Sequence, residues 1–231
     1  RHILVEDFTG QNCSNCPNAT DLIGQLQEMY GHNTIVAVGI HAGPLGVKPE
    51  KDPEGLATNL GDTYYNYWKI EMQPYGVIDR SDGTLPTDLW SAKVGWDLAA
   101  EQWPATLLNI WVTAEKAADS DKADISVKLA GMQGTTKGKL QVWLTEDNIV
   151  AFQVMPSGSK KADYVHNHVL RDAVNGEWGE DCTVGEGDLT EYSYSYTLPA
   201  GWKPENMAVV AFVYNDDGVV QVVRQELETV D

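Results

Sequence analysis

Residues 3–17, ILVEDFTGQNCSNCP, form the stretch on which the expected fold and function of this chain depend. Ile3–Phe8 is apolar with two acids near its end, a pattern typical of a central strand. After a short polar loop, Cys13 and Cys16 follow in a C-x-x-C spacing. Pro17 suits the first turn of a helix, where its missing backbone N–H costs nothing. The stretch therefore predicts a buried strand, a loop, a cysteine pair and the start of a helix.

The composition is that of a folded and strongly acidic chain. Its 231 residues are 42% hydrophobic, which is enough for a packed core in one large domain or two ordinary ones. The net charge of -18 is shared by both halves, so no acidic tail accounts for it. Such a surface repels phosphate backbones and anionic lipid, and we expect no nucleic-acid partner and no electrostatic docking to membranes. It is typical of a solvated, secreted protein.

The start of the chain and its cysteines indicate a location outside the cytoplasm. No apolar run approaches the roughly 20 residues of a membrane span. Arg1 is not a natural start, so we expect a trimmed N-terminus from which a signal or lipid-anchor sequence has been lost. The close cysteine pair suits an oxidising compartment or a redox site, and Cys182 is left over.

Up to Pro104 the sequence alternates between strand and helix patterns. Leu22, Leu26 and Met29 recur at helical spacing after the cysteines, and Gly31 is placed to end that helix. A continuous β-branched run then predicts a buried strand of the parallel type. The predicted elements are strands at 3–8 and 34–40, a proline–strand–turn segment at 73–83, and helices at about 16–30, 52–68 and 86–103.

After Pro104 the apolar period changes to that of strands. The segment 190–198 alternates strictly and places three tyrosines on one face. Asp216-Asp217-Gly218 is a hairpin signal between two apolar runs. Short strands at this density suggest an antiparallel sandwich of immunoglobulin-like type, with a domain boundary near Trp103–Ala105. The predicted strands are 105–114, 123–130, 138–145, 149–154, 190–198, 207–214 and 219–227.

The cysteine pair is the main candidate for chemistry. Cys13 would lie at the N-terminus of a helix, where backbone N–H groups and the helix dipole stabilise a thiolate. In a redox site Cys13 is then the attacking thiolate and Cys16 resolves the mixed disulfide. Zinc sites and inert structural disulfides use the same C-x-x-C spacing, so both alternatives stay open.

The same residues resemble the thioredoxin-like superfamily. In that superfamily a buried acid lies six residues before the first cysteine, as Asp7 does here, and the resemblance implies that it takes the proton of Cys16. The superfamily also has a cis-proline before an apolar strand, and Pro74 fits that position after an insertion at about 42–72. Ser14 and Asn15, between the cysteines, depart from the pairs of well-known reductases and oxidants.

Together these features predict an α/β thioredoxin-like domain followed by an all-β immunoglobulin-like sandwich. We assign residues 1–104 to the first domain, with the insertion near 42–72, and residues 105–231 to the second. The predicted catalytic residues are listed together here: Cys13, Cys16, Asp7 and Pro74.

Other candidate sites are weaker, and we expect no metal and no cofactor. His166 and His168 would share one face of a strand, but two ligands are too few for a metal site. Cys182 lies among acids that raise its pKa, which argues against a reactive thiol. Tryptophans can stack on sugars, yet Trp111 and Trp143 fall within apolar strand-like runs and are predicted to be core.

A closer resemblance covers nearly the whole chain. Val5–Gly10, Cys13–Pro17 and Val165–Asp172 resemble the Bacteroidetes outer-membrane-protein family named for its twenty-eight-kilodalton founding antigen. The resemblance implies a secreted protein at the outer membrane or cell surface, commonly lipid-anchored in its precursor. It implies no settled activity.

Two functions follow from these observations. The first is an extracytoplasmic thiol–disulfide oxidoreductase that acts on protein cysteines, with Gln73 and Pro74 shaping the substrate groove. The alternative is a non-enzymatic surface binding or adhesion protein, in which the disulfide is structural and the partner is a surface protein or a glycan.

Overall fold

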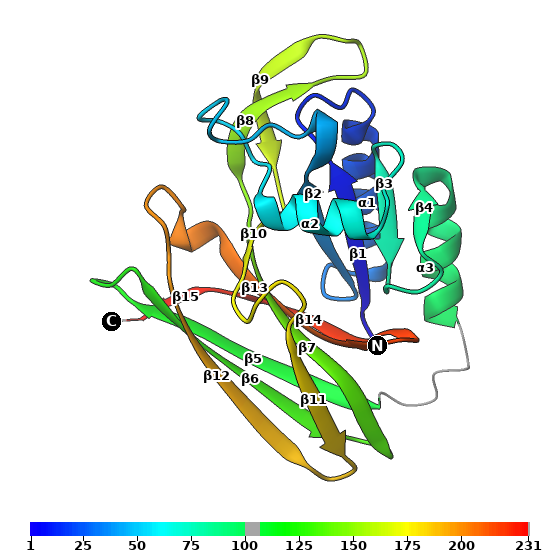
Figure 1. Ribbon diagram of the computed structural model, residues 1–231, viewed down its shortest axis with the longest axis vertical. Helices are drawn as coiled ribbons and strands as arrows, with labels where there is room; N and C mark the ends of the chain where they lie inside the picture. The colour runs from blue at the N-terminus through cyan, green and yellow to red at the C-terminus, as the bar shows by residue number, and fades with distance from the viewer. Residues whose placement is uncertain (100–106, 231) are drawn as a thin grey trace.

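The computed structural model describes residues 1–99 and 107–230 (Figure 1). Fifteen strands and three α-helices make up most of this part of the chain. The helices are α1 (Cys16–Tyr30), α2 (Asn59–Tyr67) and α3 (Trp90–Ala99), and short 3-10 turns cover Gly43–Leu45, Thr87–Leu89 and Pro204–Asn206. The strands are β1 (Ile3–Thr9), β2 (Ile35–His41), β3 (Tyr75–Ile78), β4 (Thr84–Pro86), β5 (Leu108–Ala117), β6 (Lys122–Gly131), β7 (Thr135–Glu146), β8 (Ile149–Val154), β9 (Lys160–His166), β10 (Val169–Ala173), β11 (Glu180–Gly185), β12 (Leu189–Thr197), β13 (Met207–Asn215), β14 (Gly218–Glu226) and β15 (Glu228–Val230).

One mixed sheet runs through both halves of the chain. Among the described residues it has nine strands, in the order β14-β13-β7-β10-β2-β1-β3-β4, with β11 also paired to β7. β1 pairs in parallel with β2 and antiparallel with β3. β10 adds to the other edge of β2, where Val169 lies opposite Gly39, and it pairs antiparallel with β7. Strands from the second half therefore complete the sheet that β1 and β2 begin.

The second sheet and a hairpin lie outside this path. β12, β6, β5 and β15 form a four-stranded sheet that packs against β7 and β13. Apolar side chains from the two sheets interdigitate there, among them Ile125 and Val127 from β6 and Val142 and Val209 from the long sheet. β8 and β9 form a separate hairpin that projects beyond the helical end of the molecule (Figure 1).

The predicted fold class, an α/β thioredoxin-like domain followed by an all-β immunoglobulin-like sandwich, is wrong. The described chain is mostly β-strand, and hydrogen bonding continues from β2 through β10 to β7 without a break. One apolar core joins Phe8 and Val38 to Trp143 and Phe212. A second apolar cluster, which includes Ile23, Ile35 and Trp90, lies within the first half alone. The sheet and the core around Phe8 nevertheless continue into the second half, so the described residues do not form the expected α/β domain followed by a separate sandwich. Periodicity predicts that a strand is buried but not which strand it pairs with.

The division into residues 1–104 and 105–231 remains a prediction. Its boundary near Trp103–Ala105 lies outside the described residues, as does the predicted end of the helix over 86–103. Within the described part, that helix begins as a 3-10 turn and becomes α3 only at Trp90.

Several local predictions are confirmed. α1 covers Cys16–Tyr30 and ends at Gly31, whose φ of 98° suits a residue without a side chain. β13 and β14 form the hairpin expected around Asp216-Asp217-Gly218. Gly218 has a φ of 117°, and a Cβ there would lie 2.5 Å from the Asp79 carbonyl oxygen. Glycine is therefore required both by the turn and by the close approach of the β3–β4 segment.

The helix predicted over 52–68 begins later than expected. Thr58, not Asp52, caps it, and the Thr58 hydroxyl accepts a hydrogen bond from the Gly61 N–H at 2.9 Å. The residues before Thr58 instead form turns, in which a Cβ on Gly55 would meet the Lys48 carbonyl carbon at 2.4 Å. β9, β10 and β11 were not predicted.

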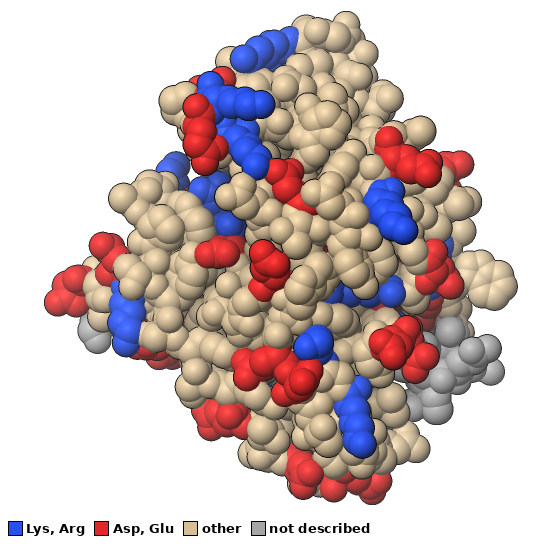
Figure 2. Space-filling view, in the orientation of Figure 1, with Lys and Arg blue, Asp and Glu red and all other residues tan. Residues whose placement is uncertain are grey.

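The surface of the described chain agrees with the acidic composition. Acidic side chains are scattered over the face seen in Figure 2 and mixed with basic ones. Within residues 1–99 and 107–230, no helix has both the length and the apolar character needed to cross a membrane.

Candidate functional site

The cysteine pair lies where β1 passes into α1, as the sequence predicts. Cys13 and Cys16 form a disulfide with Cα atoms 5.4 Å apart. Both residues are buried, with exposed fractions of 2% for Cys13 and 1% for Cys16. The helix begins at Cys16, and the Thr20 hydroxyl donates back to the Cys16 carbonyl at 3.4 Å. The disulfide is thus part of the packed interior.

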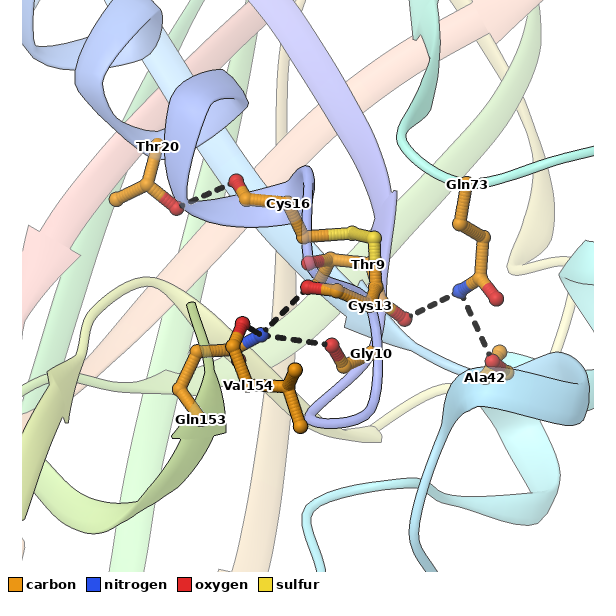
Figure 3. The surroundings of a disulfide bond; sticks show 9 residues. All are labelled: Thr9, Gly10, Cys13, Cys16, Thr20, Ala42, Gln73, Gln153 and Val154. Carbon is orange, nitrogen blue, oxygen red and sulfur yellow. Dashed lines mark hydrogen bonds between the residues drawn. A yellow bond between two sulfur atoms is a disulfide. The ribbon is translucent and has the colours of Figure 1, made fainter. Parts of the chain in front are cut away.

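Two glutamine side chains hold the cysteine loop from opposite sides (Figure 3). Gln153, from β8, donates its side-chain amide to the carbonyls of Cys13 at 2.8 Å and Gly10 at 3.2 Å. Gln73 donates to the carbonyls of Thr9 at 2.5 Å and Ala42 at 3.0 Å. The loop is therefore tied to the β8–β9 hairpin on one side and to the β2 end on the other.

A third glutamine, Gln11, connects the loop to two further segments. Its side-chain oxygen accepts from the Leu56 N–H at 2.9 Å, and its amide donates to the Glu54 carbonyl at 3.0 Å. Its backbone carbonyl accepts from the Val154 N–H at 2.8 Å. Because Gln11 is completely buried, these bonds take the place of water for its side-chain oxygen, its side-chain amide and its backbone carbonyl.

Asp7 is buried in β1, as predicted. It lies between Gly39 of β2 and Gly76 of β3, and 3% of its surface is exposed. Burial raises the pKa of Asp7 to about 8, because the charged carboxylate loses its hydration. No hydrogen-bond partner for its Oδ1 occurs among the described residues. Its carboxyl group is therefore mostly protonated at neutral pH.

A small polar cavity of about 150 Å³ adjoins Asp7. Thr20, Gln153, His41 and His166 are among its lining residues. The His41 and His166 rings meet edge to face with centroids 5.2 Å apart. Desolvation lowers the pKa of His166 to about 4 and lowers that of His41 well below its ordinary value, so both rings are neutral.

His166 and His168, the histidines considered as a possible metal pair, do not face each other in the structure. His166 ends β9 and is buried, with its ring nitrogen 3.3 Å from the Phe152 carbonyl. His168 lies in a turn with a φ of 58°, and its Nδ1 is 3.1 Å from an Asp147 carboxylate oxygen. In the part of the chain that the structure describes, no three His, Cys, Asp or Glu side chains gather as metal ligands would.

The Gln73–Pro74 peptide bond is cis, as the sequence suggested. Tyr75, the next residue, opens β3 and lies opposite Phe8 of β1. The side chain of Gln73 reaches the Thr9 carbonyl, so this segment lies beside the start of the cysteine loop. The structure thus brings the 73–75 segment, the disulfide and Asp7 to the same end of β1. Their catalytic roles stay predictions.

A buried ion pair was missed by sequence reasoning. Arg80 makes a two-pronged contact with the Glu6 carboxylate, Nε to Oε2 and Nη2 to Oε1, both at 3.0 Å. Both residues are buried, and the Arg80 guanidinium lies 4.4 Å from the ring centroid of Tyr214 and 4.8 Å from that of Phe212. The one available signal was a second acid inside the apolar run of β1.

The exposure of Cys182, Trp111 and Trp143 tests the remaining sequence predictions. Cys182 is a buried free thiol in β11, and burial raises its pKa to about 11, with Asp181 and Glu180 adding to the effect. The prediction of an unreactive thiol agrees with this. Trp143 is completely buried, as predicted, whereas Trp111 is 53% exposed and was wrongly placed in the core. In β5 the Trp111 side chain points away from the second sheet's packed face.

Comparison with known proteins gives one family. The model of the Omp28 outer membrane protein family matches residues 61–230. A solved domain of the outer membrane lipoprotein Omp28 from Porphyromonas gingivalis is 32% identical over 55% of this chain and 93% of that chain, with a TM-score of 0.40. No curated protein sequence matches the chain.

Two further solved structures share the fold. HBP35 of Porphyromonas gingivalis superposes with a TM-score of 0.74 at 14% identity, over 98% of this chain and 75% of that chain. A protein from Agrobacterium tumefaciens gives a TM-score of 0.55 at 20% identity, over 96% and 92%. At these identities the likeness concerns the fold alone.

Proposed function

Because the chain belongs to the Omp28 outer membrane protein family, we propose that it is a non-enzymatic binding protein of the outer membrane or cell surface, in which the Cys13–Cys16 disulfide is structural. The family establishes the outer-membrane association. The relative from Porphyromonas gingivalis is described as a lipoprotein, and the proposal extends a lipid anchor to the precursor of this chain.

Burial of the disulfide is the observation that carries the proposal. Thiol–disulfide exchange requires a thiolate to reach one sulfur atom directly. Here both cysteines are almost completely covered. Gln153 donates to two carbonyls of the cysteine loop and holds the loop against the β8–β9 hairpin, so opening the loop would leave the buried Gln153 amide without these partners. A sulfur in this position stabilises a fold and does not meet a substrate.

Thiol–disulfide exchange remains the competing function, because one observation favours it. Asp7 has a pKa near neutral pH, as a group that transfers protons requires. In that mechanism Cys13 attacks, Cys16 resolves the mixed disulfide, Asp7 relays the proton of Cys16, and Gln73 with Pro74 shapes the groove for a substrate cysteine.

The reduction potential of the Cys13–Cys16 disulfide decides between the two functions. We expect a value below about -300 mV, the range of structural disulfides. To measure it, the chain is equilibrated in dithiothreitol redox buffers, free thiols are alkylated, and the reduced fraction is quantified by mass spectrometry. We also expect no catalysis of insulin reduction. A potential between about -120 and -270 mV, the range of redox enzymes, would overturn the proposal.

Trapping of substrate provides a second, independent readout. A Cys16→Ser variant of a redox enzyme accumulates mixed disulfides on its attacking cysteine, whereas Cys13→Ser does not. We expect neither variant to capture reduced or oxidised proteins. Mixed disulfides on Cys13 in Cys16→Ser alone would establish the enzymatic function instead.

A further inference from the structure

A groove opens where the two halves of the chain meet, at a distance from the disulfide along the sheet. It lies between the end of α2, the loop from β10 to β11, and strands β7 and β13; Figure 1 shows that loop lying near α2. Its volume is about 830 Å³, within the range of small-molecule sites. We call it the aromatic groove and define it by six of its lining residues: Tyr67, Trp68, Trp178, Tyr214, Lys139 and Asp216.

Two rings form the platform of the aromatic groove. Trp178 and Tyr67 lie with ring centroids 4.5 Å apart, and Tyr67 is 60% exposed. Trp178 also meets the ring of Tyr64 edge to face at 5.1 Å. Trp178 is half-buried and its ring is tilted by 53° to that of Tyr67. The two rings thus offer an angled aromatic surface beside the cavity, on which the apolar face of a ligand can stack.

The platform is held in place before any ligand arrives. The Tyr214 hydroxyl donates to the Trp178 carbonyl at 2.8 Å, and the Tyr64 hydroxyl donates to the neighbouring Glu177 carbonyl. The Tyr64 hydroxyl in turn accepts from Trp143 Nε1 at 3.0 Å. Because these bonds order the loop that presents Trp178, binding there needs little further loss of conformational freedom.

Charged groups of both signs surround the platform. Lys139 pairs with Asp181 at 2.8 Å, while Lys137 and Asp216 are exposed at the rim. Arg80, on the groove lining, is neutralised by its pairing with Glu6. The groove therefore offers donors and acceptors in balance, although the chain as a whole carries a charge of -18.

The polar groups of the rim favour a ligand with donors and acceptors of its own. A purely apolar ligand would take water from Lys139 and Asp216 without replacing its hydrogen bonds.

Resting on the proposed function of a surface binding protein, we infer that the aromatic groove binds a saccharide. Sugar rings have apolar C–H faces that stack on the negative face of aromatic rings such as Trp178 and Tyr67. Their hydroxyl groups both donate and accept, which matches a rim of Lys137, Lys139, Asp181 and Asp216. The two lysines and two carboxylates of the rim give it no net charge, so the saccharide is neutral or nearly so.

The test uses the whole chain and defined sugars. The protein is first screened on an array of immobilised neutral, amino and uronic saccharides. The neutral saccharide that binds most strongly is then titrated into the protein, and binding is followed by tryptophan fluorescence and by calorimetry. We expect saturable binding. Trp178→Ala should weaken it at least about tenfold, since loss of one stacking partner removes roughly 1.4 kcal/mol or more.

Matched variants keep the result interpretable. Tyr67→Ala removes an exposed ring, so it tests the platform even if Trp178→Ala destabilises the loop. Trp96→Ala is the control, because Trp96 is 76% exposed on α3 and does not line the groove. Both groove variants should lose affinity, and the control should match wild type.

Three outcomes would overturn the inference. They are the absence of any array signal, equal binding in wild type and both groove variants, and capture of a protein partner through the groove with no saccharide bound. All three outcomes are independent of the reduction potential and of the trapping of mixed disulfides. If no saccharide binds and the disulfide does not exchange with thiols, the saccharide inference fails and the proposed function of a binding protein stands. If the disulfide catalyses thiol–disulfide exchange, the proposed function itself fails.

Discussion

The side-chain amide of Gln153 lies 2.8 Å from the carbonyl oxygen of Cys13, although 140 residues separate them in sequence. The same amide reaches the Gly10 carbonyl at 3.2 Å. A side chain from the β8–β9 hairpin thus bonds to the backbone of the cysteine loop and ties the loop to the hairpin. The environment of the disulfide is therefore set by a segment that sequence reasoning had assigned to a different domain.

Gln153→Ala should destabilise the chain by about 1–3 kcal/mol, because it removes two buried hydrogen bonds and leaves the Gly10 and Cys13 carbonyls only their bonds within the loop. Urea denaturation followed by tryptophan fluorescence measures the loss. The variant should also let dithiothreitol reduce the disulfide faster, since the cysteine loop is held less firmly. Gln133→Ala, in the exposed turn between β6 and β7, is the control and should leave both quantities unchanged. Equal stability of Gln153→Ala and wild type would contradict this account of the hairpin.

Breaking the Glu6–Arg80 pair from one side should cost about 3–5 kcal/mol, because the other charge stays buried without a partner. Arg80→Met and Glu6→Leu are the single variants, and chemical denaturation is the measurement. The double variant Glu6→Leu/Arg80→Met removes both charges and should recover much of the loss. If the losses of the single variants simply add in the double variant, the two residues do not act as a pair.

Asp7 should make the chain less stable as pH rises. Its pKa is about 8 when folded, against about 4 in the unfolded chain, so the folded state holds a proton that the unfolded state releases in between. This contribution is fully present below about pH 4 and is lost as pH rises toward 8, by at most about 5 kcal/mol.

Asp7→Asn keeps the shape of the side chain and removes the titration. Its free energy of unfolding should exceed that of wild type increasingly between about pH 5 and about pH 8.5. Urea denaturation at a series of pH values measures the difference. Two curves that stay parallel across this range would show that Asp7 does not have the raised pKa.

Cys182 should react only when the chain unfolds. Burial and its pKa of about 11 keep the thiol protonated and covered. A chromogenic disulfide reagent added without reductant should therefore find no thiol in the native chain and one after denaturation in urea. Cys182→Ala should abolish the signal in urea. A signal in urea above one thiol per chain, toward three, would mean that the Cys13–Cys16 disulfide is incompletely formed.

Part of the candidate site could be predicted because it is local. The C-x-x-C spacing brings Cys13, in the turn before α1, next to Cys16 at the start of that helix, and the apolar run of β1 buries Asp7 between two neighbouring strands. Pro74 before an apolar strand is a comparable short-range pattern. Such features depend on residues a few positions apart, and the chemistry of the backbone over that distance is strongly constrained.

The covering of the site could not be predicted. Gln153 and Gln11 are ordinary polar residues in sequence, and only their meeting across the fold makes them structural. The aromatic groove is similar, since Tyr67 and Trp178 lie more than a hundred residues apart and share no pattern. Trp111 was misplaced because an apolar neighbourhood in sequence does not say which sheet face a side chain occupies.

The sequence by itself determined the local elements around the cysteines, the hairpin at Gly218, the acidic surface and the resemblance to an outer-membrane family. Only the tertiary structure decided that β10 joins β2, so that both halves share one sheet and the core around Phe8 and Trp143. The reason is physical: local sequence indicates that a segment forms a buried strand, whereas pairing depends on which free strand edge lies nearby once the chain has folded. The folded chain also brings Gln153 of β8 to the cysteine loop and forms the groove beside α2.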